Sequence, residues 1–108
     1  GRIPALYYVG AVEGIDLFGN PVPFSFAIDT TSVFETKLEM LACHASQREW
    51  LRRQHGMDDY LETARKWSRE RGVEAGYRHA EVFRQHLGHG YPRHNLLGQV
   101  LANVTKRL

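Results

Sequence analysis

The pattern of apolar and polar positions begins with two segments that are typical of β-strands. Residues 6–12 form a nearly continuous apolar run that is rich in strand-favouring residues. Such a run is typical of a strand covered on both faces, within a parallel or mixed sheet. Residues 24–29 alternate large apolar side chains with small or polar ones, which predicts a second strand. The glycines and prolines of residues 14–23 predict turns between the two strands.

Helical spacing then replaces this pattern. Apolar residues recur at intervals of three and four positions, which predicts one buried helix face made of Phe34, Leu38, Leu41, Ala42 and Ala45. Ser32 and Glu35 have the spacing of a capping box, with Thr31 as an alternative cap residue. We expect this helix to run to residue 53 or 54, with Gly56 suited to the turn that ends it.

A second helix is predicted to start at a similar signal, Asp59 followed by Glu62, and to end at Gly72. It is highly charged, and its apolar stripe consists only of Leu61, Ala64 and Trp67. So narrow a stripe predicts a peripheral helix that packs on one side.

The remaining segments predict a third strand and a final helix. Residues 77–83 suit a strand, although residues 84–86 are also compatible with a helical extension. Residues 95–108 carry apolar side chains at helical spacing. The order is strand, strand, helix, helix, strand, helix, which indicates the α/β class. Because three strands make a poor complete sheet, residues 1–108 are expected to form one region of a larger layered domain.

Composition narrows the functional classes. With 43% hydrophobic and 24% charged residues among 108, the chain has the composition of an ordinary globular protein. Arginines alternate with glutamates and leave no clean basic stripe, so no nucleic-acid partner is expected. No apolar run approaches the ~18 residues of a membrane span, and no signal peptide is visible. The lone Cys43 sits among apolar residues, which predicts a buried, inert thiol and a reducing, cytoplasmic location.

Two segments share a pattern with a known enzyme family. Residues 32–47 read SVFETKLEMLACHASQ and contain K-x-x-M-L-x-x-H-x-S-Q after a D-T-T-S turn, and residues 76–83 read GYRHAEVF. They resemble the K-x-x-A-L-x-x-H-x-S-Q helix and the G-x-x-Y-A-E-A-F strand in the C-terminal half of the LmbE-like (PIG-L) de-N-acetylase family. The resemblance covers about residues 5 to 87. It departs at His79, where the family usually has tyrosine, and at Val82, where it usually has a small residue.

The resemblance implies the C-terminal part of a Rossmann-like layered sheet with flanking helices. The implied activity is a zinc-dependent N-deacetylase that hydrolyses the N-acetyl group of an amino sugar or its conjugate. The family's zinc ligands lie in H-P-D-D and H-P-D-H motifs, which this chain lacks. Zinc would therefore belong to the complete enzyme, and an N-terminal catalytic half would be the partner. The absence of an initiator methionine agrees with this expectation.

The same resemblance assigns two groups of residues. His79, Glu81 and Arg78 would line a polar pocket for the sugar, and an ordinary surface His/Glu pair is the other interpretation. On a strand, His79 and Glu81 face one side while Ala80 and Val82 face the other. The H-x-S-Q residues would either hold the helix end by hydrogen bonds or lie beside the ligands of the metal site. These residues are His44, Ser46 and Gln47.

Two alternatives remain open. The chain is also compatible with a non-catalytic α/β module that associates through an exposed apolar seam, since such patches favour binding. A small metal protein would instead use the spacing of His86, His89 and His94, three imidazoles that leave a fourth position for water. The pair Asp58 and Asp59 is not a zinc motif, because its context suits a helix start, where negative charge is favoured.

Overall fold

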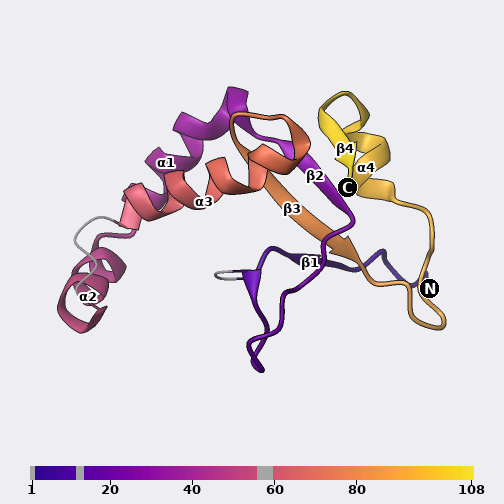
Figure 1. Ribbon diagram of the computed structural model, residues 1–108, viewed down its shortest axis with the longest axis horizontal. Helices are drawn as coiled ribbons and strands as arrows, with labels where there is room; N and C mark the ends of the chain where they lie inside the picture. The colour runs from indigo at the N-terminus through magenta and orange to yellow at the C-terminus, as the bar shows by residue number, and fades with distance from the viewer. Residues whose placement is uncertain (1, 12–13, 56–59) are drawn as a thin grey trace.

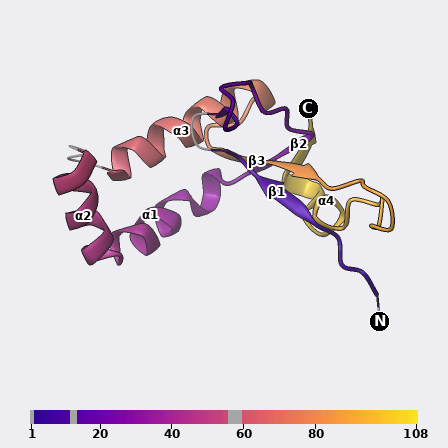
Figure 2. The same ribbon diagram turned by 90° about the horizontal axis from the view of Figure 1, so that it is seen from below.

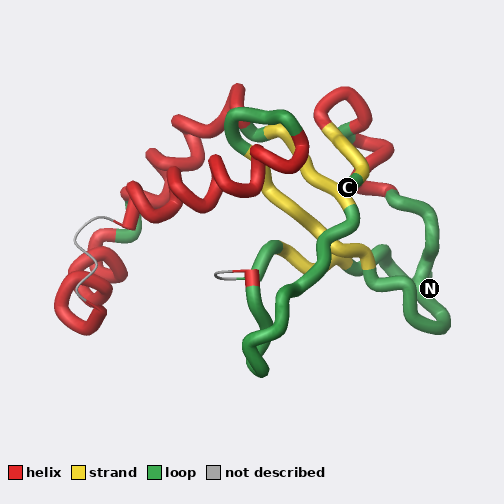
Figure 3. The backbone as a smooth tube through the Cα atoms, in the orientation of Figure 1, coloured by secondary structure: helices red, strands yellow, loops and turns green. Residues whose placement is uncertain are grey.

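The chain folds into a sheet with a helical arm that projects from it (Figure 1). The computed structural model describes residues 2–11, 14–55 and 60–108. The strand order is β1-β3-β2-β4, and every neighbouring pair is antiparallel. Figure 3 separates these strands from the helices and connecting loops. The strands are β1 Tyr7–Val9, β2 Phe26–Asp29, β3 Ala80–Gln85 and β4 Thr105–Arg107.

The helices divide between the arm and the C-terminal region. The arm contains η2 Thr31–Val33, α1 Phe34–Ala42, α2 Ala45–His55 and α3 Tyr60–Ala75. In Figures 1 and 2, α2 lies at the end of the arm that is farthest from the sheet. Figure 2 shows α1 and α3 on different sides of the sheet. The short elements α4 Leu96–Val100 and η3 Ala102–Val104 precede β4.

The strand register places small side chains under α3. Ala27 lies opposite Val82, and both belong to the buried cluster that also contains Ala75 and Ala80. Because these side chains are small, α3 can lie close to the strands. On the other face Phe26 lies opposite Phe83, and their rings stack with centroids 5.6 Å apart. The alternation predicted for the third strand is therefore confirmed for Ala80 and Val82, which are buried.

The single long helix predicted after the second strand is wrong, because the chain turns at Cys43 and His44 between α1 and α2. Each of these amides bonds to the carbonyl three residues back, at 3.2 Å, on Met40 and Leu41 respectively. The Leu41 carbonyl also accepts a hydrogen bond from the hydroxyl of Tyr60, 19 positions along the chain. The amide of His44 and the hydroxyl of Tyr60 thus occupy the Leu41 oxygen. In a continuing helix this oxygen would accept a hydrogen bond from the amide four residues further along.

The capping box predicted at Ser32 and Glu35 is also wrong. Neither η2 nor α1 has a side-chain hydrogen bond at its N-cap. The hydroxyl of Thr31, the alternative cap, bonds instead to the backbone of His79: it donates to the carbonyl at 3.4 Å and accepts from the amide at 3.2 Å. A side chain expected to cap a helix thus joins the start of the arm to β3. The predicted boundary residues Gly56 and Asp59, with Asp58, lie outside the described residues.

α3 continues beyond its predicted end at Gly72 and stops before Gly76, whose φ of 77° suits glycine. Its buried residues are Ser68, Gly72 and Ala75, at intervals of four and three. The buried stripe is therefore shifted along the helix from the predicted one. It also extends farther toward the C-terminus, where α3 contacts β3.

The α/β class is confirmed, but the arrangement of the sheet differs from the prediction. All strand pairs are antiparallel, whereas a parallel or mixed sheet was expected. β1 is an edge strand with Tyr8 and Val9 exposed, so it is not covered on both faces. Residues 105–107, predicted as helix, form β4 along the other side of β2. A Rossmann-like layering is not confirmed.

The chain exposes more surface than its size requires. Its accessible surface is 7976 Å², whereas a compact monomer of 12.4 kDa exposes about 6100 Å². Its radius of gyration is 15.7 Å, against about 13 Å for a compact domain of this length. The buried apolar core of the described residues is correspondingly small. The arm and sheet together thus leave much apolar surface open.

Candidate functional site

A pocket of about 600 Å³ lies between the helical arm and the sheet. Its apolar lining comes from five elements, β1, α1, α2, α3 and β3, and includes Val9, Leu41, Leu51, Ala64, Trp67 and Val82. Its polar lining includes Lys37, Thr63, Ser68, Arg71 and Glu81. We call this site the interhelical pocket. A volume of this size with a few polar groups on apolar walls is typical of a small-molecule site.

Two polar contacts hold the walls of the interhelical pocket together. The hydroxyl of Tyr60, at the start of α3, donates to the carbonyl of Leu41 near the end of α1. The ammonium of Lys37 on α1 donates to Oε1 of Glu81 on β3 at 2.6 Å. Since both side chains of this ion pair are more than a third exposed, its contribution to stability is small. Its effect is to place one cation and one anion side by side at the pocket wall.

Two further polar side chains, Ser68 and Arg71, line the pocket. Ser68 is only 4% exposed, and its hydroxyl has no hydrogen-bond partner within the described part of the chain. Arg71 donates to the carbonyl of Ala11 at 3.3 Å, and its guanidinium carbon lies 5.2 Å from the ring centroid of Phe24. No carboxylate of the described residues forms an ion pair with Arg71. Within the described residues, the site therefore contains a hydroxyl without a hydrogen-bond partner and a cation without a carboxylate partner.

His79 lies beside the interhelical pocket, against α1. Its ring stacks on Phe34 with centroids 3.7 Å apart and planes within 8°. Nδ1 of His79 is buried and has no partner within the described residues. Burial lowers the pKa of His79 below its ordinary value, and the nearby charges of Arg69, Arg78 and Arg65 lower it further, while Glu35 raises it. Burial and these charges therefore favour the neutral form of His79, which packs against an aromatic ring.

Acidification is expected to destabilise the chain through His79. Because its pKa is below 6.5 in the folded chain, the unfolded chain binds the proton first as the pH falls. The free energy of unfolding should therefore decrease below about pH 6.5, and His79 should have no effect above it. The measurement is the change in Tm between about pH 7.5 and pH 5.5. His79→Phe retains a ring against Phe34 but does not titrate, so its Tm should fall less.

His94→Gln is the matched control for this experiment, because His94 is exposed. Its Tm should fall as much as that of the unmodified chain. Equal decreases in all three proteins would show that His79 does not couple protonation to folding.

The residues assigned by resemblance do not converge on one point. Glu81 lines the interhelical pocket, whereas His79 packs at the start of α1 and Arg78 is exposed. The other group lies beyond the far end of α1: His44 is in the turn before α2, with Ser46 and Gln47 on α2, and all three are exposed. The length of α1 thus separates the two groups.

Sequence reasoning did not assign a role to several residues of the interhelical pocket. Lys37 is the first residue of the K-x-x-M-L pattern, so its position was visible but its partner Glu81 was not. Trp67 belonged to the predicted stripe but lies at the pocket, 36% exposed. Ser68 and Arg71 had no signal beyond helical spacing, since neither is apolar and neither belongs to a motif.

The other candidates have simpler environments. Nδ1 of His86 lies 2.8 Å from the hydroxyl of Tyr8, while His89 and His94 are exposed. Among the described residues, no three His, Cys, Asp or Glu side chains form a group that could hold a metal. The loop histidines therefore do not assemble the metal site that the alternative of a small metal protein required. Cys43 is exposed rather than buried, because it lies in the turn between α1 and α2, where its thiol donates to the carbonyl of Glu39.

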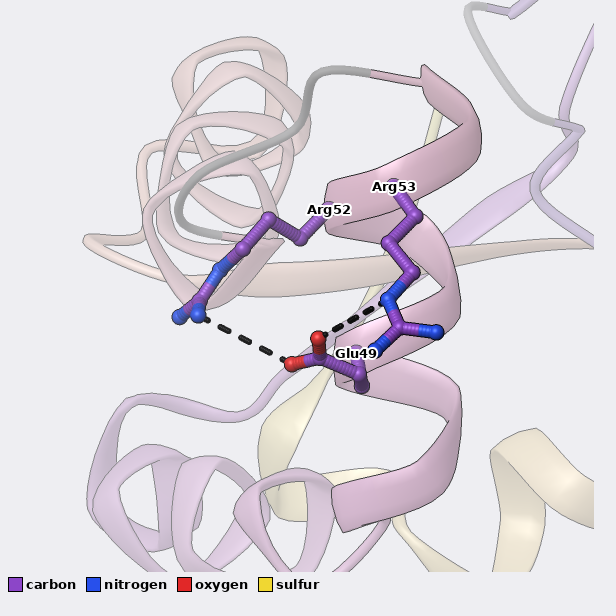
Figure 4. Close-up of polar contacts among 3 residues, drawn as sticks. All are labelled: Glu49, Arg52 and Arg53. Carbon is purple, nitrogen blue, oxygen red and sulfur yellow. Dashed lines mark hydrogen bonds and ion pairs between the residues drawn. The ribbon is translucent and has the colours of Figure 1, made fainter.

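The charged residues of α2 form local ion pairs on an exposed surface (Figure 4). The carboxylate of Glu49 lies 3.7 Å from the guanidinium of Arg52 and 3.1 Å from that of Arg53, at helical intervals of three and four. Such pairs contribute little to stability. These mixed charges thus lie on a solvated face of α2.

Comparison with models of known families, with curated proteins and with solved structures found no match to this chain. None of the helices in residues 2–11, 14–55 and 60–108 is both long and apolar enough to cross a membrane.

Proposed function

We propose that this chain is the non-catalytic, C-terminal portion of an LmbE-like zinc-dependent N-deacetylase. The whole enzyme would hydrolyse the N-acetyl group of an amino sugar or its conjugate in the cytoplasm. The chain would supply scaffold and one wall of the substrate cleft, and its four strands would border a larger Rossmann-like sheet. The sequence motifs ending in His44-x-Ser46-Gln47 and containing His79 and Glu81 support this proposal.

The observation that carries the proposal is the open surface. The accessible area exceeds that of a compact monomer by about 1900 Å², and a stable interface covers about 800 Å² on each partner. A chain of this shape would be completed by a large partner. The exposed positions of His44, Ser46 and Gln47 leave them free to contact that partner.

The described residues do not fit a zinc site, since no three candidate ligands come together. Any reactive centre would therefore belong to the partner. The contribution of this chain would be to position the substrate, and Glu81 is the carboxylate that lines both the interhelical pocket and the proposed cleft wall. Misplacing a substrate by about 1 Å can lower a rate by about 100-fold, so such a wall can be important without reacting itself.

Reconstitution tests this function. The chain is mixed with a catalytic half that carries the H-P-D-D motif, and deacetylation of an N-acetyl amino sugar is measured with and without a chelator. The chain should raise the rate, and the chelator should abolish the activity. Glu81→Gln should lower the gain by about 10- to 100-fold, because substrate positioning is lost.

Glu70→Gln is the matched control, since Glu70 is an exposed carboxylate of α3 that does not line the interhelical pocket. It should preserve the gain in rate. The proposal would be overturned if the unmodified chain did not raise the rate above that of the catalytic half alone.

A second candidate is a non-catalytic module that binds a partner through exposed apolar surface. Leu17 and Phe18 favour it, because they are 99% and 86% exposed at the tip of a tight turn. Oδ1 of Asp16 accepts hydrogen bonds from the amides of Phe18 and Asn20, which close the turn. The reconstitution separates the candidates: tight association with no gain in deacetylation favours the module.

A further inference from the structure

We propose that the interhelical pocket binds an amphipathic small molecule with an apolar body and a single anionic head. Such binding goes beyond the proposed function, because the pocket is formed by this chain alone. It is carried by three observations: the apolar walls, the buried hydroxyl of Ser68 and the charge balance around Arg71.

The apolar walls define the body of the ligand. Leu41 and Leu51 face Ala64 and Trp67 across a pocket of about 600 Å³, and Val82 of β3 adds a further wall. A volume in this range can bury most of the surface of a small ligand. The side chain of Trp67 also offers a flat surface for an acyl chain or a ring.

Ser68 indicates that the ligand carries a polar group. Its hydroxyl is buried, lines the interhelical pocket and has no partner within the described residues. Buried polar groups in folded proteins are nearly always hydrogen-bonded, so an unpaired one at a pocket calls for an explanation. A ligand oxygen that accepts a hydrogen bond from Ser68 would supply the missing partner.

The charge balance indicates that this polar group is an anion. Glu81 compensates Lys37 at 2.6 Å, so these two charges cancel. The contacts of Arg71 with the Ala11 carbonyl and the Phe24 ring hold its guanidinium without neutralising it. Within the described residues the pocket therefore carries one excess positive charge. A carboxylate head would compensate this charge, whereas an ammonium head would be repelled.

The test uses the 108-residue chain with Trp50→Phe, so that the remaining tryptophan is Trp67 in the pocket. Decanoate is titrated while the tryptophan fluorescence is followed, with decanol as the neutral ligand of equal chain length. We expect saturable binding, with decanoate at least about tenfold tighter than decanol, as one favourable charge contact can provide. Arg71→Gln should bring the two affinities together.

Two pocket variants locate the binding. Ala64→Phe fills the interhelical pocket and should abolish binding. Ser68→Ala should weaken decanoate several-fold but raise the Tm of the free chain, because it removes an unpaired buried hydroxyl. This opposite effect on affinity and stability would not arise from damage to the fold.

Leu17→Ser is the control, because the exposed turn is the other apolar surface that could attract a decanoate chain. It should leave binding unchanged. The proposal is overturned if the titration does not saturate, if Leu17→Ser rather than Ser68→Ala weakens binding, or if decanol equals decanoate. Because no deacetylation is measured, failure here leaves the proposed function untouched.

Discussion

Replacing Gly72 with alanine is expected to lower the free energy of unfolding by about 3 kcal/mol, the upper part of the range for overpacked positions. Gly72 is buried on α3, and a Cβ there would lie 2.3 Å from the carbonyl oxygen of Tyr77. That oxygen belongs to the backbone, so no side-chain rotation relieves the clash. The amide of Tyr77 also donates to the carbonyl of Gly72 at 2.9 Å, which ties the loop to the same residue.

The sign of the change in unfolding free energy separates two opposing effects of Gly72→Ala. In an exposed helix, alanine is more favourable than glycine by about 1 kcal/mol, so helix propensity alone predicts stabilisation. Urea unfolding of Gly72→Ala measures which effect dominates. Val73→Ala is the control, because Val73 is the next residue of α3 and is 77% exposed, and its change should stay within about 0.5 kcal/mol. A neutral or stabilising Gly72→Ala would mean that the loop after α3 is free to move away.

Replacing Phe34 with alanine is expected to lower the free energy of unfolding by about 3–5 kcal/mol, the usual loss for a buried phenylalanine. Phe34 is 2% exposed, and its ring stacks on His79 at 3.7 Å. Removing the ring leaves a cavity and exposes the buried side of His79. Because a domain of this size has a total stability of about 5–15 kcal/mol, the variant should be close to unfolding at moderate temperature.

Thermal and urea unfolding of Phe34→Ala measure this loss, with Val33→Ala as the control. Val33 is the preceding residue and is 54% exposed, so it tests the same helix start without opening a cavity. Phe34→Leu should be less damaging than Phe34→Ala, because it retains part of the buried volume. Similar losses for Phe34→Ala and Val33→Ala would contradict the role of Phe34 as the anchor of α1.

Both residues matter for the interhelical pocket as well as for stability. Gly72 allows α3 to lie against the segment that leads into β3, and Phe34 holds the start of α1 beside the same strand. Both helices contribute walls of the pocket. Variants at Gly72 and Phe34 are therefore expected to impair ligand binding together with folding, unlike Ser68→Ala.

Local patterns in the sequence predicted much of the fold. Residues 26–29 and 80–85 are strands, and the alternation at Ala80 and Val82 is buried as predicted, because side-chain period is a property of neighbouring residues. The helical spacing of residues 60–75 was visible for the same reason. For the candidate site, the motif identified Glu81 and included Lys37, but it did not show that they pair.

The errors occur where a distant residue competes with a local preference. Tyr60 takes the carbonyl of Leu41 and helps to end α1 early, although the segment has uninterrupted helical spacing. Thr31 bonds to His79, 48 positions away, instead of capping a helix. Residues 105–107 have helical spacing but pair with β2, because that strand offers a free edge.

For this protein, residue types and their local spacing identified the segments that form β2, β3, α1 and α3 and the motifs that they carry. The antiparallel order of the strands, the bend between α1 and α2 and the interhelical pocket depend on contacts between segments far apart in the chain. The spacing of neighbouring residues does not show such contacts. Each hydrogen-bonding group can pair with a local or a distant group, and only the folded structure decides between them. The same distant contacts decide that, among the described residues, the hydroxyl of Ser68 has no hydrogen-bond partner and the guanidinium of Arg71 has no carboxylate partner.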